Sequence, residues 1–146
     1  MRRLLVVGML AAFNFSWAAA QNLEIIKARK DLLSDMGDAT KEPGKMMKQE
    51  LPFDVATVKA SLDVIIDKAS KLPEMFPEDS KTGGKSKALA AIWQNKDDVV
   101  SRFKKLVAAA KAAKDNVADE FDFMETWPKV VGNCGACHKK YRVEKK

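Results

Sequence analysis

Residues 55–72, VATVKASLDVIIDKASKL, decide the fold of this chain. Their apolar side chains recur at steps of three and four, at Val55, Val58, Leu62, Ile65, Ala69 and Leu72. A repeat of about 3.5 residues places one apolar stripe along a helix. Pro52 and Asp54 mark its start, with Asp54 as the N-cap, and Pro73 marks its end. The stretch therefore predicts an amphipathic helix that packs against other helices.

The other long segments have the same helical periodicity, and none alternates as a strand. The first helix is expected from Leu23, Ile26, Leu33 and Met36, ending before Pro43-Gly44. A later stripe follows Val99, Phe103, Leu106, Ala110 and Ala113. The last helix is expected from about residue 116 to residue 142, with one face formed by Phe121, Met124, Trp127, Val131, Cys134, His138 and Tyr141.

Four amphipathic helices around one core predict an all-α fold, an antiparallel (up-down-up-down) four-helix bundle. Pro128 lies inside the last helix and should kink it or break it into two. The longest irregular connection is expected at residues 73–91, which contain two prolines and Gly83-Gly84.

The first twenty residues resemble an export signal. A basic start at Arg2 and Arg3 precedes an apolar run at residues 4–15, and Ala18-Ala19-Ala20 offers small residues for cleavage. The run is shorter than the roughly 20 residues that cross a bilayer. We expect a cleaved signal peptide at 1–20, one domain at 21–146, a periplasmic location and no stable membrane insertion; an uncleaved anchor is the alternative.

The charge of the chain is moderately positive. Lysine and arginine number 26 against 20 acidic residues, a formal net charge of +6. The basic residues are spread along the chain and mixed with acidic ones, whereas a phosphate-binding surface needs them clustered. Nucleic acid is therefore not an expected partner, while a salt-dependent attraction to an acidic partner stays open.

The chemistry of the chain is concentrated in Cys134-Gly135-Ala136-Cys137-His138. This is the C-x-x-C-H pattern of c-type haem attachment. Two cysteines three residues apart share one helix face, so both thiols can form thioethers with the vinyl groups of one porphyrin. His138 follows directly and can ligate the iron. The motif predicts one covalent haem c per chain, carried by the last helix.

Other interpretations of the two cysteines are a plain disulfide, a thioredoxin-like redox pair and a zinc site. The redox pair normally follows a strand, and zinc would need four ligands from a chain with two cysteines and one histidine. A single histidine excludes bis-histidine ligation of haem. The sixth position would be open or taken by another side chain, the methionine candidates being Met36, Met46, Met47, Met75 and Met124.

Together these features resemble the cytochrome c′ family of class II c-type cytochromes. The markers are the C-x-x-C-H motif late in the chain followed by residues 139–142, KKYR, with AR at 28–29, LPFD at 51–54 and AIW at 91–93. The resemblance implies that Arg29 lies near a haem propionate, that Lys30 contacts the haem and that Leu33 packs against the open face of the iron. Residues i and i+4 share a helix face, which agrees with this arrangement.

The resemblance also implies haem contacts from Ser86 and Lys87, and a proximal role for Arg142 beside the iron-bound imidazole. An ordinary solvated arginine is the alternative for Arg29, and simple core packing is the alternative for Leu33. Pro128 is not part of the family pattern.

Leucine cannot ligate iron, so with Leu33 at this position the resemblance implies a five-coordinate, high-spin haem. An apolar pocket would then admit nitric oxide or carbon monoxide and exclude water and anions. The expected function is gas binding, in nitric oxide detoxification or electron transfer, without enzymatic activity. The alternatives are a six-coordinate electron carrier with a methionine ligand such as Met36, and a binding module with a disulfide. Family members pair through their first two helices, and Val55, Val64 or Ile66 could form that surface of a homodimer; the redox partner is unknown.

Overall fold

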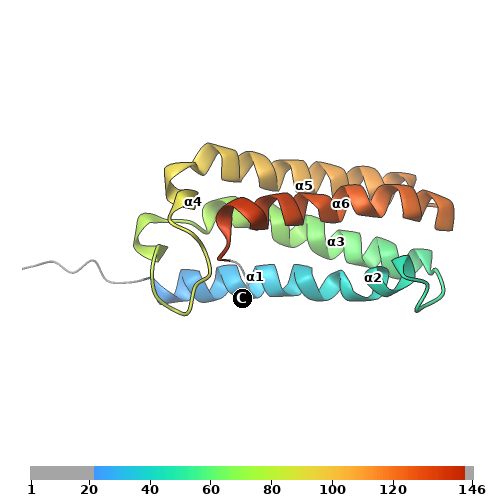
Figure 1. Cartoon of the computed structure of the whole chain (residues 1–146), viewed down its shortest axis with the longest axis horizontal. Coiled ribbons are helices and arrows are strands. Elements are labelled where there is room, and N and C mark those ends of the chain that lie inside the picture. Colours follow the sequence, from blue (N-terminus) through green and yellow to red (C-terminus); the bar gives the residue numbers. More distant parts are fainter. Residues whose placement is uncertain (1–21, 144–146) are drawn as a thin grey trace, which may run out of the picture.

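The protein is a bundle of four long antiparallel helices, as the sequence predicts (Figure 1). The computed structural model describes residues 22–143. The long helices are α1 (Leu23–Ala39), α3 (Val55–Lys71), α5 (Lys96–Asn116) and α6 (Glu120–Tyr141).

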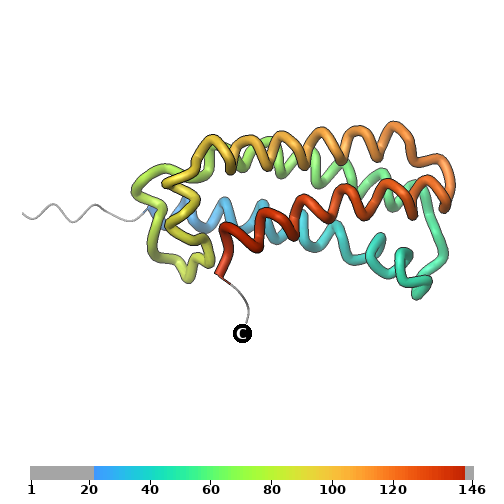
Figure 2. Tube along the Cα trace, turned by 45° about the horizontal axis from the view of Figure 1, so that its top comes forward, coloured from blue at the N-terminus to red at the C-terminus, as the bar shows by residue number. Residues whose placement is uncertain are grey.

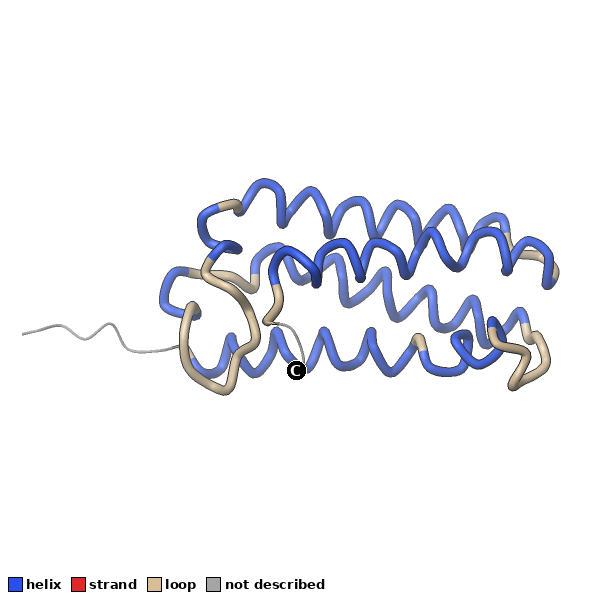
Figure 3. Tube along the Cα trace, viewed as in Figure 1, coloured by secondary structure: helices blue, strands red, loops and turns tan. Residues whose placement is uncertain are grey.

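Short helical segments connect the long helices. They are α2 (Lys41–Met47), the 3-10 turns η1 (Leu72–Glu74) and η2 (Glu78–Ser80), and α4 (Ala91–Gln94). α2 was not predicted from the sequence, because the first helix was expected to end before Pro43-Gly44. Pro43 is the third residue of α2, where a backbone N–H has no partner within the helix, so the missing donor carries no penalty. Loops and turns gather at the two ends of the bundle (Figure 3).

The order of packing explains where the bundle can open. α1 packs on α3, α3 on α5, and α5 on α6. Figure 2 shows the same sequence of neighbours from a second direction. The long loop between η1 and α4 crosses one end of the bundle, beside the start of α1 (Figure 1). The fourth side lies between α1 and α6, the first and last long helices of the described chain.

α3 forms the centre of the core, as its pattern predicts. Asp54 caps the helix by accepting a hydrogen bond from the Thr57 amide at 2.8 Å. Its stripe is almost fully buried at Val58, Leu62, Ile65, Ala69 and Leu72. The stripe of α5 is equally buried, at Val99, Phe103, Leu106, Ala110 and Ala113. The 3.5-residue repeat therefore identified the inner faces of these two helices.

The predicted inner face of α6 is partly wrong. Phe121 is 76% exposed and Met124 is 41% exposed. The buried residues in this half are Phe123, Trp127 and Val130, at steps of four and three. The sequence expectation began the helix near residue 116, whereas Asp119 caps it and sets the start at Glu120. Leu23 was also placed on a stripe and is 52% exposed.

Pro128 does not break α6, which runs as one helix from Glu120 to Tyr141. Its side chain is exposed. The ring removes the amide that would bond to the Met124 carbonyl, and Met124 itself lies on the solvent side. Water can satisfy this carbonyl, which is the physical reason that the helix tolerates proline here.

The proposed second apolar stripe on α3 is mostly the edge of the core. Val55 and Ile66 pack against the buried cluster of their own chain, which leaves Val64 as the one half-buried candidate outside it. Dimerisation through this face stays a prediction. Within residues 22–143, no helix has the length and apolar character needed to cross a membrane. The predicted signal segment, residues 1–20, lies outside the described residues.

Replacing Leu62 by alanine should lower the free energy of unfolding by about 2–5 kcal/mol, because its side chain is fully buried at the centre of the bundle. Val64→Ala on the same helix is the matched control and should cost roughly 1 kcal/mol or less. Urea unfolding followed by circular dichroism measures both. Equal losses for the two variants would contradict the assigned inner face of α3.

Candidate functional site

A pocket of about 780 Å³ lies between α1, α5, α6 and the loop at residues 85–88. This volume is within the range of small-molecule and cofactor sites. Its inner wall is apolar and comes mainly from Phe76, Ile92, Val99, Phe103 and Leu106. Because three sides of the bundle are closed by helix packing, the pocket occupies the side between α1 and α6.

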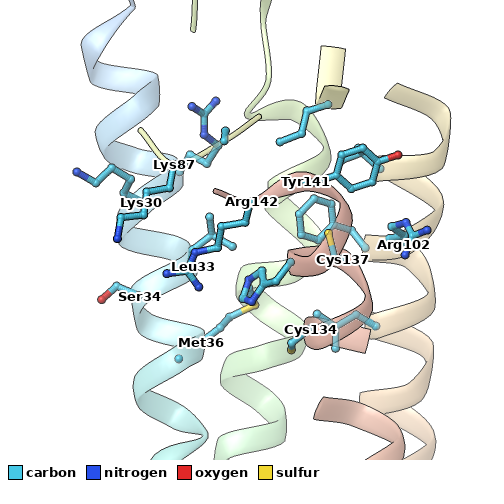
Figure 4. Close-up of a pocket in the computed structure, with 18 of the residues that line it drawn as sticks. Lys30, Leu33, Ser34, Met36, Lys87, Arg102, Cys134, Cys137, Tyr141 and Arg142 are labelled. Carbon is cyan, nitrogen blue, oxygen red and sulfur yellow. The ribbon is translucent and has the colours of Figure 1, made fainter. Parts of the chain in front are cut away.

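All nine residues singled out from the sequence line this pocket. They are Arg29, Lys30 and Leu33 from α1, Ser86 and Lys87 from the loop, and Cys134, Cys137, His138 and Arg142 from α6 and its end. Figure 4 shows the labelled members arranged around the opening, with Leu33 and Met36 on α1 facing Cys134 and Cys137 on α6. The structure thus brings together three segments that are far apart in sequence.

The two cysteines lie one turn apart on α6, and both are half-buried free thiols. Burial raises the pKa of each thiol, so both are protonated at neutral pH. The described residues contain no strand to support a thioredoxin-like motif. Nor do they gather three or more metal-binding side chains of the kind that zinc requires. Two thiols on one pocket wall fit attachment of a single large group.

His138 stands in the last turn of α6, directly after the cysteine pair. Partial burial, and then the charge of Arg142, lower the pKa of its imidazole. The neutral ring, which is the form that ligates metals, is therefore favoured at neutral pH. The Arg142 amide donates to the His138 carbonyl at 3.0 Å and closes the helix. Both side chains face the same pocket.

Arg29 is 2% exposed, so it is not the ordinary solvated arginine kept as an alternative. Its guanidinium donates to the Met75 carbonyl at 2.8 Å, to the Ser80 hydroxyl at 3.1 Å and carbonyl at 3.2 Å, and to the Ser86 hydroxyl at 3.4 Å. The charged group also lies 4.8 Å from the ring centre of Phe76. One side chain of α1 therefore holds three points of the long loop.

The guanidinium of Arg29 forms no ion pair among the described residues. Burial lowers its pKa, yet arginine stays charged in proteins. A buried charge without an opposite charge is costly, and its neutral partners offset only part of this cost. Because Arg29 also lines the pocket, the site favours a ligand with an anionic group on this side.

The loop at the pocket edge is tied to the end of α6. The Leu89 amide donates to the Tyr141 carbonyl at 3.0 Å, and the Val143 amide donates to the Lys87 carbonyl at 2.9 Å. These bonds form an isolated antiparallel bridge between Ala88 and Arg142. The residues that follow the histidine are thus held by backbone bonds from outside their helix.

The sequence analysis missed a second support for this region. Asp98 on α5 accepts hydrogen bonds from the Tyr141 hydroxyl at 2.5 Å, from the Lys140 ammonium at 2.9 Å and from Arg102 at 3.0 Å. Arg102 also donates to the carbonyl of Ala136, inside the cysteine motif, at 3.3 Å. Nothing in the sequence indicates that Asp98 faces Tyr141, because the two residues lie 43 positions apart on different helices.

Of the five methionines that the sequence left open as a sixth ligand, Met36 is the one that lines the pocket. It is 8% exposed and lines the pocket from α1, three residues after Leu33. Leu33 itself is 36% exposed and is not part of the buried cluster.

Asp98→Asn should reduce the loss of stability that accompanies a fall in pH below about 4. Hydrogen bonds from Tyr141, Lys140 and Arg102 hold the pKa of the Asp98 carboxyl well below its usual range. A carboxyl with a lowered native pKa stabilises the fold above its unfolded pKa of about 3.9 and loses this contribution as the pH falls toward the native value. The variant should melt lower at pH 7 and show a smaller further decrease from pH 4 to pH 2 than the unmodified protein.

Melting curves at pH 7, 4, 3 and 2 measure this difference. Asp97→Asn changes the same charge on the adjacent residue and is the matched control, with an expected profile close to that of the unmodified protein. If the melting temperature of Asp98→Asn falls with pH in parallel with that of the unmodified protein, the hydrogen bonds to Asp98 contribute nothing specific at acid pH.

A four-helix bundle whose C-x-x-C-H motif borders a cofactor-sized pocket belongs to the class of haem-binding bundles. The family model for cytochrome c′ matches residues 24–142. Cytochrome c′ from Rhodopseudomonas palustris is 41% identical over 143 residues, 98% of this chain and 97% of that protein. Cytochrome c-556 from Agrobacterium fabrum is 35% identical over 121 residues, 82% of each chain.

A solved structure of Rhodopseudomonas palustris cytochrome c′ superimposes with a TM-score of 0.82 at 44% identity, covering 84% of this chain and 98% of that chain. The chain belongs to the cytochrome c′ family. Members of this family are haem proteins and not enzymes. The residues of the pocket fit a haem group. They offer two thiols, an imidazole, an apolar wall and the buried guanidinium of Arg29, which has no carboxylate partner among the described residues.

Proposed function

We propose that this protein is a periplasmic cytochrome whose covalent haem c binds small neutral gases. Cys134 and Cys137 would form the thioethers, and His138 would be the axial ligand of the iron. The observation that carries the proposal is that these three side chains and an apolar wall line one pocket of cofactor size. The haem supplies iron that can bind a diatomic ligand.

Arg29 supports the expected orientation of the haem. Its guanidinium is buried, faces the pocket and has no ion pair among the described residues. A propionate placed there would compensate this charge. The Ser86 hydroxyl, already bonded to Arg29, and the ammonium groups of Lys30 and Lys87 lie on the same side and could contact the propionates. Arg142 would lie on the side of the haem that faces His138 and would influence the imidazole bound to the iron.

Leu33 supports five-coordinate iron. It lines the pocket from α1, across from the helix that carries His138, and its side chain has no atom that can ligate a metal. Water or an anion entering beside leucine would lose hydration without gaining a hydrogen bond, whereas nitric oxide and carbon monoxide have little hydration to lose. The pocket therefore favours the binding of small gases. The protein would then serve in nitric oxide binding and detoxification, or in electron transfer.

A second candidate is a six-coordinate electron carrier. Met36 lines the same pocket on the same helix, and its thioether is a haem ligand in other cytochromes. Because Met36 lines the pocket, replacing it can test whether its sulfur ligates the iron. The family resemblance also supports a homodimer. The redox partner is unknown.

Covalent attachment predicts the mass of the denatured protein. The polypeptide should carry the additional mass of one haem, and the haem should stay with the chain in acidified organic solvent. Cys134→Ser with Cys137→Ser should release it completely, whereas either single variant should keep one thioether. A bare polypeptide mass for the unmodified protein, purified from cells able to attach haem, would disprove the assignment of the motif.

Leu33→Met should convert the ferrous spectrum from high-spin toward low-spin, because a thioether at this place can ligate iron. Leu33→Ala should speed carbon monoxide binding by removing the side chain that covers the iron. Leu32 is the matched control, since it packs against the core and does not line the pocket, so Leu32→Met should leave the spectrum unchanged.

Optical spectra and flash photolysis measure both effects. If the unmodified ferrous protein is already low-spin, the six-coordinate alternative holds, and Met36→Leu should then produce the high-spin form. Unchanged carbon monoxide kinetics in Leu33→Ala would place the covering residue elsewhere on α1.

A further inference from the structure

His138 lacks the protein partner that usually orients a metal-binding imidazole. Such a histidine almost always donates its second ring N–H to a carboxylate, a backbone carbonyl or water, and this bond fixes the plane of the ring. Among residues 22–143, no carboxylate or carbonyl accepts a hydrogen bond from the His138 side chain. The protein therefore orients this ring only through the backbone that carries it, in the last turns of α6.

Arg102 on α5 holds that backbone from the packed side of the helix. Its Nη1 donates to the carbonyl of Ala136 at 3.3 Å, between the two cysteines of the motif. Its Nε donates at 3.0 Å to Asp98, which lies one turn earlier on the same helix. A planar guanidinium presents its donors in a rigid fork, unlike an ammonium group. The direction of the bond to Ala136 is therefore set by the carboxylate of Asp98.

Asp98 also fixes the far end of the same turn. Its carboxylate accepts a hydrogen bond from the Tyr141 hydroxyl at 2.5 Å, and Tyr141 is only 3% exposed. The ring centre of Tyr141 lies 5.6 Å from the guanidinium of Arg102, and Figure 4 shows both residues on the same side of the pocket. The bonds to Ala136 and Tyr141 lie on either side of His138 in the sequence. α5 thus holds the segment that carries the histidine at two points.

We propose that Asp98 and Arg102 are positioning residues that set the plane of the His138 imidazole relative to the haem. The inference rests on the proposed haem site. Thioethers at the two cysteines would fix the porphyrin to α6, so a movement of the backbone around them would turn the imidazole against the porphyrin. The orientation of an axial ligand is one of the means by which a protein tunes the electronic properties of haem iron.

A positioning role and a purely electrostatic role predict different patterns of change. Arg102 is a cation and Asp98 is an anion, so their removal changes the local charge in opposite directions. Removal of either residue nevertheless releases the same turn of α6. An electrostatic effect should therefore shift a property of the iron in opposite directions in Asp98→Ala and Arg102→Met, whereas loss of positioning should change it in the same direction.

The test uses proton NMR of the ferric, haem-loaded protein. The four haem methyl groups have different hyperfine shifts because the imidazole plane points in one direction, and the spread of these shifts narrows when the ring samples several orientations. Asp98→Ala, Arg102→Met and Tyr141→Phe should each narrow the spread, although Tyr141→Phe changes no charge. Lys105→Met removes a cation from an exposed residue of α5 outside the pocket and is the matched control, with an unchanged spread.

Arg102→Lys separates charge from geometry. Lysine keeps the cation but cannot hold Asp98 and Ala136 with one rigid group, so the narrowing should persist. A spread equal to that of the unmodified protein in Arg102→Lys would overturn the positioning role. Opposite changes in Asp98→Ala and Arg102→Met, or an unchanged spread in all variants, would do the same.

The spectra are recorded at a temperature at which circular dichroism shows every variant to be folded. Ferric haem gives hyperfine shifts in both its high-spin and its low-spin form, so the test does not depend on the sixth ligand. A bare polypeptide mass would disprove the haem proposal and this inference together. Haem-loaded variants with an unchanged spread would overturn this inference alone.

Discussion

The burial of the Arg29 guanidinium is the constraint on which this end of the molecule depends. Four hydrogen bonds from one side chain of α1 replace the hydration of a full charge, and all of them go to the long loop. The loop in turn carries Ser86 and Lys87 to the pocket and pairs with the segment after His138. Arg29 therefore fixes the loop on the first helix, and the backbone bridge between Ala88 and Arg142 fixes the end of the last helix on the loop.

The bundle separates stability from binding. The interfaces from α1 to α3, α3 to α5 and α5 to α6 bury the core, and the remaining side between α1 and α6 holds the pocket. Buried apolar area on three sides supplies the driving force for folding, so the fourth side can present polar and reactive groups. Asp98 and Arg102 show how the two functions meet, because they brace the motif from the packed side.

The sequence predicted most of what depends on local pattern. Three signals are short-range: the repeat at residues 55–72, the cap at Asp54 and the C-x-x-C-H motif. The helices and the family could be predicted from them. It failed where the outcome depends on tertiary context. The register of Phe121 and Met124 was set by a cap several residues away from the expected start, and Pro128 was tolerated because its side of α6 faces solvent. The partners of Asp98 required knowledge of the packing of α5 against α6.

The pocket is built from the first and last long helices of the described chain. Leu33 and His138 stand about one hundred residues apart in sequence, yet they line the same space. Closing a loop of this length costs entropy before the contacts of the pocket can repay it. We therefore expect the pocket to form late in folding. Partial opening of either terminal helix would disturb the haem environment before the central pair α3 and α5 came apart.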